Sequence, residues 1–139
     1  MKASSTYGGH GYGYAPGNAV DGSPNKMWAP NDGPDSWLLI DLADRHYFGS
    51  LFWQHLPVRN RATHYGMMKA LRVRVGDKDE NDLNGNEVCA ENLDLSEKRN
   101  NRVYCTDGPI WGRYVVLQKG PTPKSERFFV AEIKVYEVV

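Results

Sequence analysis

Hydrophobic and polar positions alternate along several short segments of this chain. Leu71, Val73 and Val75 alternate with arginines, and Ile133 and Val135 alternate with lysine and tyrosine. A period of two residues is typical of a β-strand that buries one face and exposes the other. The pattern predicts strands at 37–42, 50–54, 70–75, 102–105, 113–118 and 128–139, and no long helix.

Polar segments rich in glycine or proline separate the predicted strands, at 7–17, 55–66, 77–87 and 120–125. Such residues favour turns, and loops of this kind commonly carry function. Strands with one apolar face, joined by loops, predict an all-β sandwich of two sheets. The 139 residues, 40% of them hydrophobic, fit a single domain that spans 1–139.

Charge and hydropathy exclude several partners. Seventeen basic residues balance seventeen acidic ones, so no global field would attract nucleic acid or an anionic membrane. No apolar segment is long enough to span a bilayer, and the first residues lack the apolar core of a signal peptide. These features fit a secreted protein without its signal peptide as well as a cytosolic protein.

The segment from Asn18 to Asn25 is rich in oxygen atoms. Asp21, Ser23 and the backbone carbonyls offer the carboxylate and carbonyl ligands that a calcium ion takes, and Gly22 permits a sharp reversal. An Asp-Gly pair is also a common turn without any ion. The residues themselves therefore leave a cation loop and a plain turn as alternatives.

A second segment, 55–69, gathers positive charge, imidazoles and an aromatic ring in one predicted loop. The arginine fork suits vicinal hydroxyls, carboxylate or sulfate, and a tyrosine ring can stack on a sugar. The alternative interpretation is a solvated basic loop. The candidate ligand-binding residues are His55, Arg59, Arg61, His64, Tyr65 and Lys69.

Short motifs spread from residue 4 to residue 136 resemble the discoidin-like superfamily (coagulation factor five/eight type C, galactose-binding-like). Within it, they resemble the F-type lectin (fucolectin) family most. This resemblance implies a discoidin-like jelly-roll β-sandwich that binds carbohydrate, is stabilised by calcium and has no enzymatic activity. The motifs are Asn18-Ala-Val-Asp21-Gly, Trp28, Ser36-Trp37, Ile40-Asp41-Leu42, Gly112-Arg-Tyr-Val115 and Ala131-Glu132-Ile-Lys-Val-Tyr136.

The resemblance also implies a calcium site that joins the first loop to the last strand. Glu132 falls on the outward, polar phase of that strand, so its carboxylate would meet either a cation or water. Without an ion, Asp21 would cap a turn and Glu132 would be solvated. The implied ligands are Asn18, Asp21, Ser23, Asn31, Ala131 and Glu132.

Cys89 and Cys105 could form a bridge, remain as buried thiols or provide half of a metal site, and no second Cys or His pair completes a zinc pattern. The resemblance implies a disulfide between them. Closing a loop of about 15 residues in this way contributes about 3 kcal/mol. A disulfide implies an oxidising compartment, and so a secreted, extracellular protein. The resemblance also implies a role in cell adhesion.

The sugar-binding motif of the family is altered here. Fucose-binding members carry an upstream His and an Arg-x-Asp-x4-Arg/Lys motif. Arg61 takes the first Arg place, Thr63 replaces Asp, and Lys69 lies one residue beyond the last basic place. No His lies near Asp35, where the upstream one is expected. The sequence therefore predicts a different glycan, acidic sugars included, as the partner.

The competing interpretation is a discoidin-type module that binds protein or phospholipid through apolar loop tips, for which Leu56-Pro-Val58 and Met67-Met68 are available. In either case the membrane would be reached only through glycans or lipid headgroups. No hydrolase elbow or metalloprotease helix accompanies the four histidines. One shallow site gives modest affinity, so we expect an oligomer or a larger protein.

Aromatic residues outside the loop 55–69 fall into two groups. Trp28, Trp37 and Trp53 are predicted to pack in the core, whereas Trp111 follows a turn and is the tryptophan expected to be exposed. Trp111 and the Gly- and Tyr-rich segment 7–14 are candidate walls of the binding site.

Overall fold

The fold of the chain is taken from a computed structural model that describes residues 2–4, 28, 36–54, 68, 70–95, 100–120, 128, 130 and 132–138. These residues form seven strands and one short 3-10 helix, and every pair of neighbouring strands is antiparallel. The elements are β1 (Lys2–Ala3), β2 (Trp37–Gln54), β3 (Leu71–Gly76), η4 (Leu83–Gly85), β4 (Glu87–Leu93), β5 (Asn100–Tyr104), β6 (Ile110–Lys119) and β7 (Glu132–Glu137).

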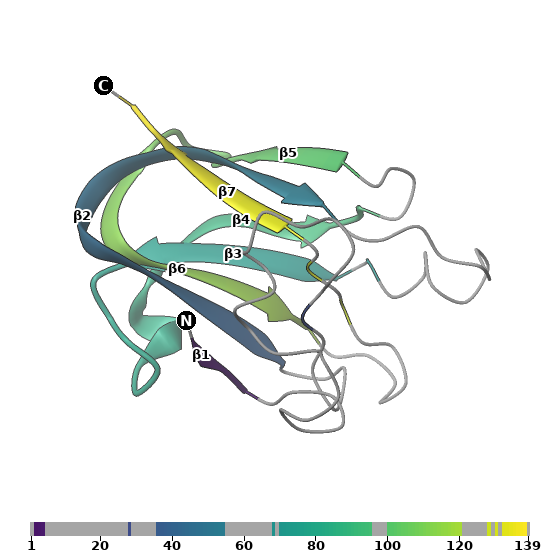
Figure 1. Ribbon diagram of the computed structural model, residues 1–139, viewed down its shortest axis with the longest axis horizontal. Coiled ribbons are helices and arrows are strands. Elements are labelled where there is room, and N and C mark those ends of the chain that lie inside the picture. Colours follow the sequence, from purple (N-terminus) through teal and green to yellow (C-terminus); the bar gives the residue numbers. More distant parts are fainter. Residues whose placement is uncertain are drawn as a thin grey trace.

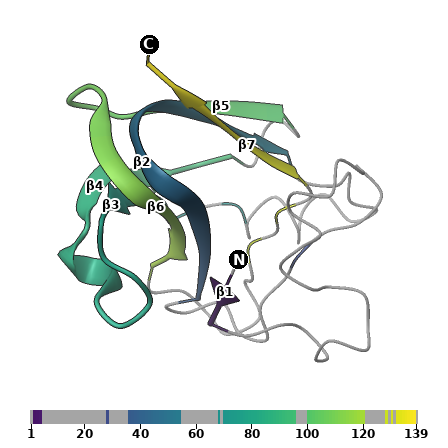
Figure 2. The same cartoon turned by 60° about the vertical axis from the view of Figure 1, so that its left-hand side comes forward.

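The long strand β2 belongs to both layers of the fold. Its first half pairs with β1 and β6, and its second half pairs with β5 and β7. Figure 1 shows β2 and β6 curling together at one end of the molecule, and the turned view in Figure 2 shows the same curl. The larger layer is β1-β2-β6-β3-β4, and the smaller layer is β5 and β7 on either side of the second half of β2. The predicted all-β sandwich is confirmed.

A local irregularity lets β2 bend. Its pairing with β6 shifts between Asp41 and His46, and Ala43 has a positive φ of 73°. The Asp41 carboxylate accepts the Ala43 N–H at 2.8 Å and both Nε and Nη2 of Arg113, at 2.8 and 2.9 Å. Such an irregularity bends a strand and increases its twist. The prediction of two separate strands, 37–42 and 50–54, is wrong because the polar residues between them form this bend.

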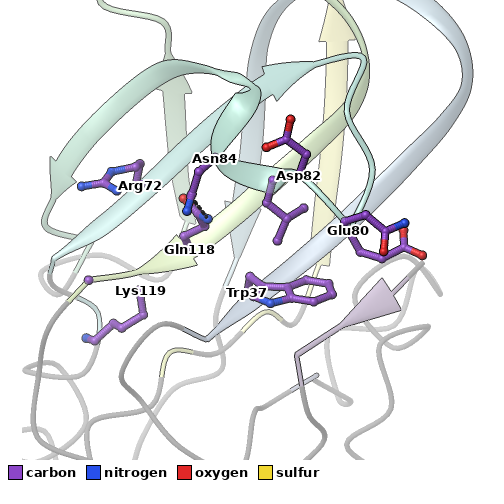
Figure 3. Close-up of a pocket in the computed structure, with 10 residues that line it drawn as sticks. Trp37, Arg72, Glu80, Asp82, Asn84, Gln118 and Lys119 are labelled. Atoms are coloured by element: carbon purple, nitrogen blue, oxygen red, sulfur yellow. Dashed lines mark hydrogen bonds between the residues drawn. The ribbon is translucent and has the colours of Figure 1, made fainter.

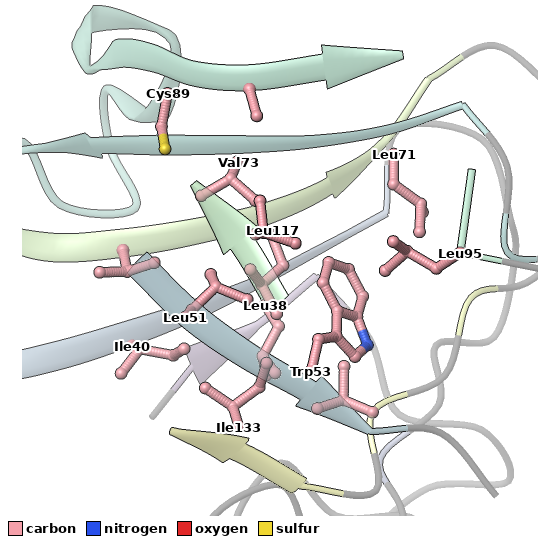
Figure 4. Packing of buried hydrophobic residues seen from close by; sticks show 14 of the residues in the cluster. Leu38, Ile40, Leu51, Trp53, Leu71, Val73, Cys89, Leu95, Leu117 and Ile133 are labelled. Atoms are coloured by element: carbon pink, nitrogen blue, oxygen red, sulfur yellow. The ribbon is translucent and has the colours of Figure 1, made fainter. Parts of the chain in front are cut away.

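The hydrophobic core lies between the two layers. Figure 4 shows Leu38 and Leu117 from the larger layer packed toward Leu51 and Trp53 of the smaller one. Trp28 and Trp53 are fully buried, as predicted, whereas Trp37 is half-buried and faces away from this core. The expectation for Trp37 was therefore wrong.

Strand β4 was not predicted from the sequence. Its pairing with β3 shifts twice, between Leu71 and Val73 and again between Val73 and Arg74, and Asn92 has a positive φ of 54°. These irregularities remove the period of two on which the prediction relied. At the other end of the chain, β7 is shorter than the predicted strand 128–139.

A disulfide joins Cys89 of β4 to Cys105, the residue after β5, with the Cα atoms 4.3 Å apart. The Thr106 N–H also donates to the Cys89 carbonyl at 2.9 Å. Since β4 lies in the larger layer and β5 in the smaller, the bridge ties the two layers together. The disulfide implied by the family resemblance is confirmed.

Candidate functional site

A cleft of about 460 Å³ opens on the outer face of the larger layer. Figure 3 shows its labelled side chains, which come from β2, β3, β6 and the segment 77–86. Six of these side chains carry charged or amide groups, and one is an indole. We call this site the Trp37 cleft, and its labelled residues are Trp37, Arg72, Glu80, Asp82, Asn84, Gln118 and Lys119.

A small apolar cluster holds the segment 77–86 against the sheet. Leu39 of β2 and Val116 of β6 point away from the main core and pack with Leu83 of η4. Apolar residues on both faces of central strands are expected where both faces are covered. The buried side chain of Asn86 accepts the Lys78 N–H and donates to the Lys78 carbonyl, both at 2.9 Å. One wall of the cleft is therefore fixed by packing and by hydrogen bonds.

Hydrogen bonds orient the polar groups on the floor of the cleft. Arg74 donates through Nε to Gln118 Oε1 at 3.0 Å and through Nη1 to the Asn86 carbonyl at 2.8 Å. Gln118 in turn donates to Asn84 Oδ1 at 3.3 Å. Burial, followed by the nearby charge of Arg72, lowers the pKa of Arg74. The floor of the cleft is therefore a chain of oriented amide groups beside a guanidinium.

Charged groups of both signs lie around this floor. In Figure 3, Arg72 lies toward one end of the cleft and Glu80 toward the other, whereas the side chain of Lys119 points away from the cleft and is buried. Arg72 Nε is 3.7 Å from the Glu91 carboxylate, and this buried nitrogen has no hydrogen-bond partner among the described residues. Asp82 is exposed and its side chain makes no cap bond to η4. The cleft thus offers hydrogen-bond donors and acceptors to a polar ligand.

The six predicted ligand-binding residues of the loop 55–69 lie outside the described residues, so their role stays a prediction. The chain leaves that loop beside the cleft, because Gly120, which lines the cleft, donates its N–H to the Ala70 carbonyl at 2.9 Å. Sequence reasoning missed the cleft itself. The segment 77–87 was predicted as one of four polar loops that could carry function, but it was not singled out as a binding site.

Trp111 is exposed, as predicted, with 55% of its surface accessible. It stacks on Tyr47 with ring centroids 5.0 Å apart, and the Arg45 guanidinium lies 5.9 Å from its ring. Both rings belong to the curled end of β2 and β6, and neither lines the Trp37 cleft. The structure does not bring this predicted wall to the cleft, and the predicted wall at 7–14 lies outside the described residues.

Of the six implied calcium ligands, Glu132 is the one that the structure describes. It is 8% exposed, so the alternative in which its side chain points outward and is solvated is wrong. Two residues earlier, Val130 forms a bridge with Trp28, in which each N–H donates to the other carbonyl, at 2.8 and 3.1 Å. Because both bridge residues are fully buried, this end of β7 lies inside the fold.

Among the described residues, no three His, Cys, Asp or Glu side chains are grouped as metal ligands would be. In the same part of the chain, no helix has the length and apolarity that crossing a membrane requires.

Comparison with known proteins identifies a family match and several similar structures. Residues 1–126 match the F5/8 type C domain. Curated protein sequences gave no significant match.

The similar structures share the fold. A fucolectin from striped bass (Morone saxatilis) serum has a TM-score of 0.79 and 20% identity, covering 99% of this chain and 44% of that one. The lectin domain of lectinolysin, in complex with Lewis B antigen, has a TM-score of 0.74 and 20% identity, covering 99% and 92%. The CBM32 of AlyQ, in complex with 4,5-unsaturated mannuronic acid, has a TM-score of 0.72 and 13% identity, covering 99% and 93%. This chain thus spans less than half of the fucolectin chain.

Proposed function

Because this chain belongs to the F5/8 type C domain family, as its resemblance to the discoidin-like superfamily predicted, we propose that it is a carbohydrate-binding domain. In this proposal it binds glycans in the manner of an F-type lectin and catalyses no reaction. The similar structures include a fucolectin and two domains bound to carbohydrate.

The Trp37 cleft is the observation that carries this proposal. Its volume of about 460 Å³ falls within the range of roughly 300–1,000 Å³ that is usual for ligand sites. A sugar presents hydroxyl groups that both donate and accept hydrogen bonds, together with an apolar ring face. The hydroxyls can form hydrogen bonds with the side chains of Asp82, Asn84 and Gln118. The apolar ring face can stack on the half-buried indole of Trp37.

The basic loop 55–69 is proposed to complete the site from the edge of the cleft. Arg61 and the neighbouring basic residues would bind sugar hydroxyls or an acidic group. Thr63 stands in place of the motif's aspartate, so the ligand is proposed to be a glycan other than simple fucose.

Calcium is proposed as a structural ion that joins the Asn18–Asp21 loop to Glu132. The Trp28–Val130 bridge supports this, since it places a residue shortly after the loop beside the start of β7. The Glu132 carboxylate is buried, and a cation is one of the groups that stabilise a buried carboxylate. The ion would supply stability and would not take part in any chemical step.

The calcium proposal is tested by thermal unfolding in calcium and in chelator. We expect calcium to raise the Tm of the wild-type protein, and Glu132→Gln to abolish most of that difference. Glu137→Gln is the matched control, since this glutamate lies at the exposed end of the same strand. A calcium response that Glu132→Gln leaves intact would exclude Glu132 as a ligand.

The disulfide supports a proposal about location. Disulfides persist in oxidising compartments, so we propose that the protein is extracellular. A contribution to cell adhesion through glycans is proposed from the family resemblance alone. Attachment to a larger protein or an oligomer would supply avidity.

A glycan array tests the proposed function. The folded protein is applied in calcium and in chelator to fucosylated, other neutral, sulfated and uronic-acid glycans. Binding to a defined glycan class supports the proposal, and competition by the free sugar confirms that the sugar itself is recognised. An array without any binding, together with binding to protein or phospholipid, would replace the proposal with the discoidin-type alternative.

A further inference from the structure

A second recess lies on the outer face of the smaller layer. It has a volume of about 320 Å³. We call it the Arg102 hollow and define it by Ser50, Arg102, Tyr104, Tyr136 and Val138. The main core separates it from the Trp37 cleft, because the alternate residues of the same strands, such as Leu51 and Val103, are buried in that core.

Strand register creates this hollow. Ser50 of β2 pairs with Tyr104 of β5 on one side and with Tyr136 of β7 on the other. A small residue on the central strand between two large ones leaves a depression with aromatic walls. Tyr104 is 65% exposed and Tyr136 is 39% exposed, so both rings are accessible to a ligand.

Val138, which forms one wall of the hollow, lies close to β2 because β2 has a glycine at that point. The pairing of β2 with β7 shifts between Phe48 and Ser50, so that Gly49 is the extra residue. A Cβ at Gly49 would lie 2.8 Å from Val138 Cγ2, and the Val138 N–H donates to the Tyr47 carbonyl at 2.8 Å. The hollow is therefore built on packed strands.

The guanidinium of Arg102 is held in this hollow by two contacts. Its Nε donates to Ser50 Oγ at 2.9 Å, and its central carbon lies 4.0 Å from the centroid of the Tyr136 ring. Ser50 is 4% exposed, so this anchor is shielded from water. Within the described residues, the two terminal amino groups of Arg102 make no hydrogen bond. The arginine fork is thus preorganised and available for an anion.

The surrounding charges favour an anionic ligand. Lys134 of β7 lies on the same face of the sheet as Arg102, because both residues pair with Phe52 of β2. Its Nζ is 5.9 Å from the centroid of the Phe52 ring. Glu137 also lines the hollow, but its carboxylate is 2.9 Å from His46 Nδ1 and is engaged there. Two cations thus lie near this one carboxylate, so the balance of these charges favours an anion in the hollow.

We infer that the Arg102 hollow is a second glycan site, which binds a sugar carrying a carboxylate or a sulfate group. This inference rests on the proposed carbohydrate-binding function. The anionic group would accept hydrogen bonds from the terminal amino groups of Arg102, and the sugar ring would stack on Tyr104. Because the two recesses lie on opposite faces, one domain could hold a neutral glycan and an acidic one at the same time.

Titration of isotope-labelled protein followed by NMR tests this inference. The probes are galacturonate, galactose 6-sulfate and galactose, which share a ring and differ in charge. We expect the two acidic sugars to shift the backbone resonances of 102–104 and 136, and galactose to leave them unchanged. The two acidic probes also distinguish carboxylate from sulfate as the preferred group.

Variants at exposed positions give the quantitative test. Arg102→Gln should weaken binding of the acidic sugars by about tenfold or more, since it removes hydrogen bonds to a charged group. Arg102→Lys keeps the positive charge but lacks the planar guanidinium fork, so it should weaken binding of the acidic sugars less than Arg102→Gln does. Arg45→Gln is the matched control, because it removes an exposed guanidinium outside the hollow. Circular dichroism verifies that each variant is folded.

Two results would overturn the inference. The first is an absence of shifts at 102–104 and 136 with both acidic sugars at tens of millimolar. The second is binding of an acidic sugar that Arg102→Gln does not weaken. Either result leaves the proposed function intact if glycans still bind elsewhere on the domain, whereas a domain that binds no glycan at all contradicts both.

Discussion

The two outer faces of the sandwich differ in chemistry although one strand, β2, contributes to both. Its first half presents Trp37 beside carboxylate and amide groups, and its second half presents Ser50 beside an arginine and two tyrosines. The inward residues of both halves are uniformly apolar. Packing of the inward side chains therefore fixes the position of β2. The outward side chains of β2 differ between its two halves, because each half contributes to a different recess. One scaffold can in this way carry two recesses of different ligand preference.

The largest expected effect comes from removing the disulfide that joins the two layers. The double change Cys89→Ala and Cys105→Ala should lower the free energy of unfolding by about 3 kcal/mol, measured by urea denaturation. Because Cys105 lines the Arg102 hollow, acidic-sugar binding should also fall more than neutral-glycan binding. Wild-type protein in reducing agent is the control. Unchanged stability would show that strand pairing alone holds the layers together.

An effect on affinity alone is expected from Asp82→Asn in the Trp37 cleft. This change removes a charge at constant size, so it should weaken neutral-glycan binding by about tenfold and leave the Tm unchanged. Isothermal titration measures the affinity. Asp107→Asn, an exposed aspartate outside both recesses, is the control. If Asp82→Asn weakens acidic-sugar binding instead, the separation of the two sites is wrong.

The smallest expected effect is a pH dependence at the bend between the two halves of β2. Hydrogen bonds from Arg113, and then from the Ala43 N–H, lower the pKa of Asp41 to about 2. A carboxyl with a depressed pKa stabilises the folded state fully above its unfolded value of about 3.9. That contribution is lost as the pH falls from this value toward 2, and it is small because the pair is exposed.

Asp41→Asn isolates this contribution. Urea denaturation should find the variant less stable than wild type near neutral pH, with the difference shrinking as the pH approaches 2. Asp44→Asn is the control, because it changes a neighbouring exposed aspartate. A difference that stays constant with pH would mean that Asp41 acts through backbone geometry and not through its charge.

The sequence was most informative where one face of a strand is buried. Alternation located Leu71, Val73 and Val75 correctly because their side chains all enter the core. It failed at β2, where polar residues around Asp41 form a bend that resembles a loop, and at β4, where register shifts interrupt the period.

The two recesses could not be predicted, because each depends on contacts between distant segments. The Trp37 cleft needs Leu83 to pack on the outer face of the sheet, and the Arg102 hollow needs Ser50 in register with Tyr104 and Tyr136. Strand register is not encoded in any local pattern of these residues. The family resemblance supplied the disulfide, which the structure confirms, and the class of function that we propose.

The most direct test of carbohydrate binding in the Trp37 cleft is an NMR titration with the neutral glycan that binds best on the array. We predict saturable shifts of the Trp37 indole N–H and of the backbone resonances of 80–84, with little change at 102–104. Saturable glycan binding that leaves Trp37 and 80–84 unperturbed would contradict the account and would assign recognition to another part of the domain.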